Sequence, residues 1–314
     1  MTTMTRRSLL KLSAATGAAA GLALPGTVRA ARAARTKNLV VVGQNGNLNI
    51  VTPGGAMLMY YQYNWQTGLG SFIGPSSNGS GFESFSSIAS CGVAYTYDNI
   101  YVCVNSSGVY GYYWKAGPRS WANSGAAVRI ATTSAAGWAN LSKVFSGGCN
   151  LSTPDRHGNV FYTIDSSGQL FWHKYLGVPG EGGYWAANSG RRIGVGWGGF
   201  QYVTAAATGT FYAVDNTGTM RWYRYTDPDG GASNNWAANP GRVIGAGWYG
   251  GPYGYQTVQS AGVDWNDGNA YDGGLYMVDK NGDLRWNRHQ DWYSGKPDWD
   301  YPTGGGPIIG RGWM

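Results

Sequence analysis

In three variable loops the sequence sets an asparagine two or three residues after a tryptophan: Trp121 with Asn123, Trp185 with Asn188, and Trp236 with Asn239. An indole ring offers a flat apolar face, and a carboxamide offers both a hydrogen-bond donor and an acceptor. Together they suit a sugar, which shows C–H groups on one face and hydroxyl groups at its rim. The alternative is structural: the ring would plug the edge of a sheet, and the amide would stabilise a turn.

Further residues recur around these pairs. Trp299 stands in the same place of another copy, but it lies between Asp298 and Asp300 and no asparagine follows it. Arg191 and Arg242 follow the second and third pairs. Each copy then ends in a tryptophan preceded by glycine: Trp138, Trp197, Trp248 and Trp313. All of these are candidate ligand-binding residues, although packing between repeats would also explain the terminal tryptophans.

The repeat lacks residues for catalysis. The two glutamates, Glu83 and Glu181, occupy unrelated positions, whereas glycoside hydrolysis needs a convergent pair of carboxylates. The aspartates that recur stand at the start of a tight turn, where bonding to the turn explains them: Asp165, Asp215 and Asp279. The histidines lack metal-ligand spacing: His157, His173 and His289. We expect no enzyme activity, no metal and no cofactor.

All these residues belong to a unit that the chain repeats. In four copies a turn glycine precedes the terminal tryptophan by 29 to 31 residues: 108 to 138, 168 to 197, 218 to 248 and 282 to 313. A more divergent first copy has Gly55 in the turn and Phe82 in place of the tryptophan. A unit that recurs at a period of tens of residues predicts a repeat architecture. We count five units.

Each unit divides into four strands. In the fourth unit, a turn at 214–218 joins two aromatic and β-branched runs, 211–214 and 220–225, into a hairpin. A variable loop and a third run at 242–244 follow, and one more run, 255–260, comes after the Gly-Trp corner. Four antiparallel strands make one blade of a β-propeller. The sequence therefore predicts an all-β fold, a five-bladed β-propeller with four antiparallel strands per blade.

The unit boundaries predict one domain, 31–314, with blades at about 38–82, 83–138, 139–197, 198–248 and 249–314. The chain ends one residue after the last Gly-Trp, and the run at 38–42 supplies the strand that follows this corner in the other units. We therefore expect the ring to be closed blade-to-blade, with the first and last blades meeting as whole blades.

The first 30 residues lie outside the repeat. Residues 5–11, Thr-Arg-Arg-Ser-Leu-Leu-Lys, resemble the twin-arginine export motif. We expect residues 1–30 to be a bacterial signal peptide, cleaved after Ala30 or Ala33, and the protein to be secreted. The leader holds four cations and no acid, so its removal lowers the formal charge from +7 to +3. The chain that remains has no clustered basic stripe of the kind that indicates nucleic-acid binding. After the leader, no apolar run is long enough to span a membrane.

Three cysteines would reach an oxidising compartment after export. Cys91 ends one strand run and Cys103 lies in the next, so we predict a disulfide between them. Cys149, near the equivalent place of the following unit, is the alternative partner. The remaining thiol would be buried and inert.

Residues 235–238, Asn-Trp-Ala-Ala, followed by Ile-Gly-Ala-Gly-Trp at 244–248, an aromatic run and a hairpin, resemble the repeat of the tachylectin family. The resemblance covers nearly the whole mature chain and is best in the last three units. It implies a five-bladed propeller lectin that binds N-acetylglucosamine and N-acetylgalactosamine, with one site per blade between neighbouring blades. It also implies that the loop tryptophan, the nearby asparagine and the Gly-Trp corner line each site. Because the first and last units depart from the pattern, the third and fourth are the first candidates.

The leading hypothesis is a secreted lectin for N-acetylated hexosamines on chitin, peptidoglycan or cell-surface glycans, which could stay associated with the cell wall. The alternative is a protein-interaction or targeting propeller of a secreted assembly. Its variable loops, such as 177–183 and 264–274, would then contact a protein partner. Inhibition by free sugar would favour the first hypothesis, and a stable protein partner would favour the second.

Overall fold

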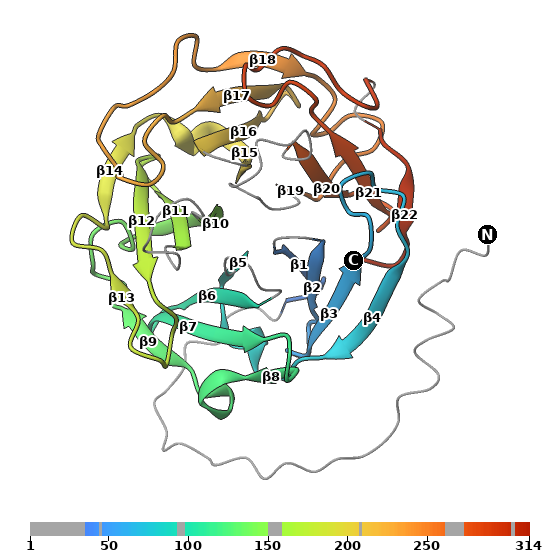
Figure 1. The fold of residues 1–314 in the computed structure, drawn as a ribbon. Coiled ribbons are helices and arrows are strands. Elements are labelled where there is room, and N and C mark those ends of the chain that lie inside the picture. The colour runs from blue at the N-terminus through green and yellow to red at the C-terminus, as the bar shows by residue number, and fades with distance from the viewer. Residues whose placement is uncertain are drawn as a thin grey trace.

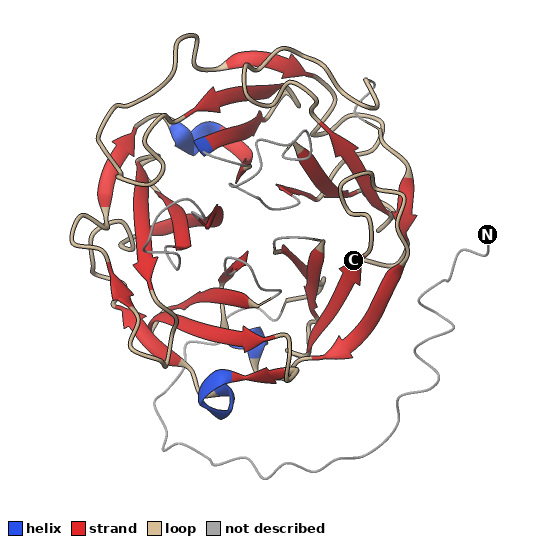
Figure 2. Ribbon diagram, in the orientation of Figure 1, coloured by secondary structure: helices blue, strands red, loops and turns tan. Residues whose placement is uncertain are grey.

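The computed structural model describes residues 35–43, 46–92, 98–149, 159–206, 209–260, 273–302 and 305–314. The strands form five sheets arranged around a central axis, as Figure 1 shows. Figure 2 shows that strands make up nearly all of the regular secondary structure. The described helices are short 3₁₀ turns: Phe82–Ser84 (η1), Ala122–Gly125 (η2) and Trp197–Gly199 (η3). The predicted all-β, five-bladed propeller is confirmed.

Each sheet is antiparallel, and its strands follow one another in chain order from the axis outward (Figure 1). The first blade consists of β1 (Leu39–Val42), β2 (Asn47–Val51), β3 (Met57–Gln62) and β4 (Phe72–Ser77). The fourth consists of β15 (Phe200–Ala205), β16 (Thr210–Asp215), β17 (Met220–Arg224) and β18 (Arg242–Gly245). The fifth consists of β19 (Thr257–Ser260), β20 (Gly274–Val278), β21 (Leu284–Arg288) and β22 (Ile308–Gly310).

In the second and third blades the outermost strand position is split in two. The second blade has β5 (Ser87–Gly92), β6 (Asn99–Asn105) and β7 (Gly108–Lys115), with β8 (Ser120–Trp121) and β9 (Val128–Ala131) both pairing with β7. The third has β10 (Leu141–Cys149), β11 (Asn159–Asp165) and β12 (Leu170–Leu176), with β13 (Tyr184–Trp185) and β14 (Arg191–Gly194) both pairing with β12. In the fourth and fifth blades, a single antiparallel bridge takes the place of the first of these two short strands. Tyr225 pairs with Trp236 in the fourth blade, and His289 pairs with Trp299 in the fifth.

The hydrophobic core is divided among the five interfaces between neighbouring blades. We call these interfaces seams and number them by their blades, from seam 1/2 to seam 5/1. Each seam holds one cluster of buried side chains. Trp172, Trp222 and Trp286 from the third strands are at most 3% exposed and fill three of these clusters. The propeller is therefore held together by aromatic packing from blade to blade.

Gln259 of β19 links the last blade to the first. Its Nε2 donates a hydrogen bond to the Val40 carbonyl at 2.6 Å, and its Oε1 accepts one from the Val42 N–H at 2.9 Å. A related link joins blades 4 and 5, where Thr204 Oγ1 accepts a bond from the Ser260 N–H at 2.9 Å. The ring thus closes between two whole blades.

We expect Gln259→Ala to lower the free energy of unfolding by about 1–3 kcal/mol, because two main-chain groups of β1 lose their partner. Gln201→Ala is the control, since Gln201 is exposed on β15 and its loss should cost less than about 0.5 kcal/mol. Urea unfolding of both variants measures the difference. Equal midpoints would show that this closure link does not stabilise the ring.

The predicted disulfide between Cys91 and Cys103 is wrong. Cys91 lies opposite Ile100 and Cys103 lies opposite Ile88, so the two are three residues out of register, about 10 Å along the strands. An odd offset also turns the side chains to opposite faces, with Cys91 in the core of seam 2/3 and Cys103 in that of seam 1/2. A disulfide needs Cα atoms within about 7 Å.

Cys103 is instead a buried free thiol whose pKa is raised by burial, which makes it inert. The side chain of Cys149 lies outside the described residues.

Candidate functional site

The terminal tryptophans lie inside the seams. Trp138, Trp197, Trp248 and Trp313 are 1–4% exposed. Each packs against an aromatic ring of the next blade, and Trp313 does so across the ring closure. The ring centroids are 5.6 Å apart for Trp138 and Trp185, 5.5 Å for Trp197 and Trp236, 5.1 Å for Trp248 and Trp299, and 4.9 Å for Trp313 and Tyr60. Rings this buried offer no face to a sugar, so their role is packing.

The loop tryptophans connect each blade to the one before it. The indole N–H donates to a backbone carbonyl of the preceding blade: Trp121 to Asn78, Trp185 to Ile130 at 2.7 Å, Trp236 to Ile193 at 2.8 Å, and Trp299 to Ile244 at 2.7 Å. Trp299 is buried, whereas the other three rings are half-buried. The polar edge of these rings therefore links neighbouring blades, as the structural alternative predicts. On three of the four rings, part of the surface remains accessible to a ligand.

The structure separates Trp185 from the Asn188 and Arg191 that follow it. The Trp185 ring faces the second blade. In contrast, the side chains of Asn188 and Arg191 donate to the carbonyls of Gly230 and Gly231 in the fourth blade, at 3.4 Å for Arg191. Residues close in sequence therefore belong to different seams.

At seam 3/4, loop 230–236 of the fourth blade accepts the hydrogen bonds of Asn188 and Arg191 at one end and carries Trp236 at the other. This loop runs along the edge of the third blade. In the middle of the loop, the Ser233 hydroxyl donates a hydrogen bond to the Arg192 carbonyl at 3.2 Å. Lys174 Nζ also pairs with Asp229 Oδ1 at 2.7 Å across the same seam. The site combines amide and guanidinium donors with part of an indole face.

The neighbouring seams repeat parts of this arrangement. At seam 4/5, Arg242 Nη1 donates to the Ser294 carbonyl at 3.3 Å, on the same seam as Trp299. Asn239 is exposed with a positive φ of 59°, and Asn123 has a φ of 49°, so both occupy turn positions that asparagine tolerates well. Hydrogen-bond donors and apolar ring faces of this kind can bind a neutral polar ligand.

The prediction that the recurring aspartates serve their turns is confirmed. In Asp165, Asp215 and Asp279, Oδ1 accepts the backbone N–H groups two and four residues further on, at 2.9–3.1 Å. The Thr217 hydroxyl and the turn N–H groups hold the pKa of Asp215 below its usual range. These carboxylates are committed to the backbone.

His173 is a structural residue of seam 2/3. Its ring packs 4.6 Å from that of Trp138. The Thr163 hydroxyl donates to the Gly137 carbonyl at 2.6 Å, so its oxygen accepts from His173 Nε2 at 2.9 Å. Burial lowers the pKa of His173 to about 3. His289 is also buried, and His157 lies outside the described residues. Within the described ranges, no His, Cys, Asp or Glu residues cluster as metal ligands.

The buried His173 predicts acid sensitivity. Its pKa is about 3 in the fold against a reference value of 6.5, so the unfolded chain binds the proton first. Its stabilising effect is complete above pH 6.5 and is lost as the pH falls toward 3. We expect wild type to lose roughly 2–3 kcal/mol more than His173→Gln between pH 7 and pH 4, measured by urea unfolding at both pH values. Identical pH dependence would contradict this.

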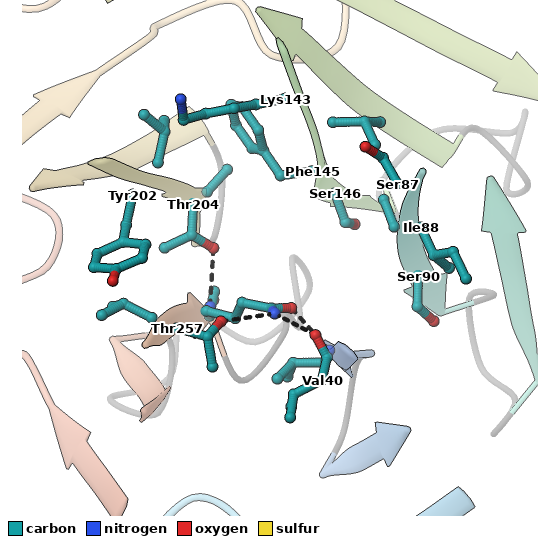
Figure 3. A pocket seen from close by; sticks show the side chains of 18 of the residues that line it. Val40, Ser87, Ile88, Ser90, Lys143, Phe145, Ser146, Tyr202, Thr204 and Thr257 are labelled. Atoms are coloured by element: carbon teal, nitrogen blue, oxygen red, sulfur yellow. Dashed lines mark hydrogen bonds between the residues drawn. The ribbon is translucent and has the colours of Figure 1, made fainter. Parts of the chain in front are cut away.

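The molecule also has a channel along its central axis. It has a volume of about 240 Å³ and is bounded by the five innermost strands. Figure 3 shows hydroxyl side chains around it, including Ser87, Ser90, Ser146 and Thr204, with Lys143 beside them. Burial lowers the pKa of Lys143. The described lining contains no carboxylate to pair with this amine in acid–base chemistry.

Sequence reasoning missed a larger pocket, of about 520 Å³, at seam 1/2. Met59, Asn78 and Trp114 are among its lining residues. The signal for it is in the sequence, because Met59 aligns with the third-strand tryptophans Trp172 and Trp222 of later blades.

No helix in the described part of the chain is both long and apolar enough to cross a membrane. No curated protein matches the sequence. Among solved structures, the chain is similar to the BP39L lectin from Burkholderia pseudomallei, at 14% identity over 82% of this chain and 65% of that one, with a TM-score of 0.41. It therefore spans just under two thirds of that lectin's length.

The fold is also similar to that of the fucose-specific lectin from Aleuria aurantia, at 14% identity over 87% of this chain and 82% of that one, with a TM-score of 0.42. AofleA from Arthrobotrys oligospora is similar at 9% identity, over 84% of this chain and 70% of that one, with a TM-score of 0.44. The family model described as Tachylectin matches residues 62–253 and 163–314, which together cover four of the five blades and part of the first. The chain therefore belongs to the tachylectin family of lectins.

Proposed function

We propose that the protein is a lectin that binds N-acetylated hexosamines, N-acetylglucosamine or N-acetylgalactosamine, at the blade seams. Membership of the tachylectin family supports this proposal. The observation that carries it is seam 3/4, where Asn188 and Arg191 of one blade bond to the loop of the next blade that carries the half-buried Trp236. The amide and guanidinium groups suit hydroxyl and acetamido oxygens, and the indole suits the apolar sugar face.

Each seam should bind free sugar weakly, with a Kd around millimolar, or about −4 kcal/mol. Several seams on one rigid ring can raise the avidity for a polymer by roughly 10²–10⁴. This arrangement favours polyvalent targets such as chitin, peptidoglycan and cell-surface glycans. We infer that the protein acts by binding alone, without enzymatic activity and without a cofactor.

Arg191 and Arg192 offer a matched test. Both are exposed, but Arg191 reaches across the seam, whereas Arg192 Nη1 bonds to Gln169 of its own blade at 2.9 Å. We expect Arg191→Gln to shorten retention on immobilised N-acetylglucosamine and Arg192→Gln to leave it unchanged. Free N-acetylglucosamine should elute the wild type, and glucose should not.

Retention that survives a large excess of free N-acetylglucosamine would contradict the proposal. If a stable protein partner were then recovered from the medium, it would support the alternative of a targeting or interaction propeller. Of the loops that the alternative invokes, 264–272 lies outside the described residues.

We further propose that residues 1–30 direct twin-arginine export and that the protein works outside the cell, free or associated with the wall. The Thr-Arg-Arg motif at 5–7 supports this. Replacing Arg6 and Arg7 with lysine should leave the uncleaved protein inside the cell, whereas Arg29→Lys should be exported. Normal export of the double variant would contradict twin-arginine transport. These residues lie outside the described part of the structure.

A further inference from the structure

The innermost strands of the five blades place equivalent residues at equivalent heights around the central channel. Counted from the turn glycine of each blade, the innermost strand pairs with the second strand in the same register over four consecutive residues in all five blades. The chain therefore forms rings of five residues, one from each blade, that follow one another along the channel.

One of these rings, which we call the aliphatic ring, contains only β-branched aliphatic residues. Its members pair with the residue five positions before the turn glycine: Val40, Ile88, Val144, Val203 and Val258. All five line the channel; Val144 is half-buried, and the others are at most 8% exposed. Because such side chains have few rotamers, the ring presents a fixed apolar surface, which favours a hydrocarbon group over water.

The adjacent ring, which we call the charged ring, carries a single charge. Its members are Lys143 and four uncharged residues: Leu39, Ser87, Tyr202 and Thr257. Among the described residues, no acidic side chain forms an ion pair with Lys143, and burial lowers the pKa of its amine. Figure 3 shows the Lys143 side chain at the edge of the cavity, which Ser87 and Thr257 also border. A partly buried ammonium group without a counter-ion is stabilised by an anion.

We propose that the central channel binds a small aliphatic carboxylate, with its carboxylate group at Lys143 and its hydrocarbon chain inside the aliphatic ring. The hydroxyl groups of Ser87 and Thr257, in the same ring as Lys143, are further donors for the carboxylate. The cavity volume of about 240 Å³ lies below the roughly 300–1,000 Å³ of sites for drug-sized ligands, so the ligand has only a few carbon atoms.

This ligand class matches both rings at once. An inorganic anion would leave the aliphatic ring without an apolar partner, and a neutral alcohol would leave Lys143 without a counter-ion. The described lining carries no carboxylate that would repel the ligand. Neither Asn188 nor Arg191 lines the channel, so this inference goes beyond the proposed sugar binding and does not depend on it.

The test is a titration of the mature protein with n-butyrate, followed by the Cδ1 methyl resonance of Ile88 in a ¹³C-methyl-labelled sample and assigned by its loss in Ile88→Val. We expect a saturable shift, and an affinity for n-butyrate roughly tenfold higher than for acetate, because two further methylene groups enter the aliphatic ring. Inorganic phosphate and n-butanol each match only one ring and should bind at least roughly tenfold more weakly than n-butyrate.

Lys143→Met removes the charge but keeps a long side chain, and it should weaken n-butyrate binding roughly tenfold. Lys280→Met is the matched control, because Lys280 is exposed in the turn after β20 and its loss changes the net charge equally. It should bind n-butyrate like the wild type.

The proposal is overturned if the Ile88 resonance does not respond to n-butyrate up to high millimolar concentration. Equal affinities for acetate and n-butyrate, or binding of phosphate as tight as that of n-butyrate, would show that the aliphatic ring takes no part. Unchanged binding in Lys143→Met would rule out the amine. Elution by N-acetylglucosamine tests the seams separately, so either proposal can fail while the other stands.

Discussion

Replacement of Trp236 by alanine is expected to lower the free energy of unfolding by about 3–5 kcal/mol. The ring lies 5.5 Å from Trp197, 5.5 Å from Phe211 and 5.4 Å from Tyr225, centroid to centroid. Its N–H also donates to the Ile193 carbonyl of the neighbouring blade. The substitution therefore opens a cavity at seam 3/4 and removes a link between blades.

Urea unfolding followed by circular dichroism measures this loss. Trp236→Phe keeps much of the packing and should cost less than the alanine variant. Tyr184→Ala is the control, because Tyr184 is 63% exposed and its loss should cost less than about 0.5 kcal/mol. A loss below about 1 kcal/mol for Trp236→Ala would contradict a packing role. The expected loss also makes this variant a poor probe of sugar binding.

The second large effect is expected at Arg285. Its Nε pairs with Asp279 Oδ2 at 2.9 Å, and its Nη1 donates to the carbonyls of Gly305 and Gly306 at 3.2 and 3.0 Å. The Asp279 side chain is only 1% exposed. Arg285→Met would leave a buried carboxylate without its cation, and we expect a loss of about 3–5 kcal/mol.

The preceding blade provides a matched control. Arg221 occupies the same position and faces Asp215 at 3.6 Å, but the Asp215 side chain is 20% exposed and that of Arg221 is 38% exposed. Arg221→Met should therefore cost no more than about 1 kcal/mol. Thermal unfolding of both variants gives the comparison. Equal losses would show that burial does not set the strength of these pairs.

The fold could be predicted from the sequence because its signals are local and recur. The turn at Asp215, the glycine-tryptophan corner at Trp248 and the strand runs between them follow one another at fixed spacing, and each describes structure within a single blade. The observed strands agree with the predicted runs to within two residues. In the first blade, Phe82 follows Gly81 at a φ of 90° and takes the buried place of the terminal tryptophan.

The candidate site could be predicted only in part, because it is built between blades. Sequence spacing joins Trp185 to Asn188, whereas the path of the chain sends these side chains to opposite sides of the third blade. The error over Cys91 and Cys103 has a related cause, since proximity in sequence does not give strand register. The pocket at seam 1/2 depends on the space that Met59 leaves unfilled, which a motif search does not detect.

The most direct test of the account is a calorimetric titration of the mature protein with N-acetylglucosamine, with glucose as the control sugar. The account predicts saturable binding of the acetylated sugar with a Kd around millimolar, and no heat of binding from glucose. The absence of any response to N-acetylglucosamine up to high millimolar concentration would contradict it. The aromatic seams would then serve only to hold the blades together.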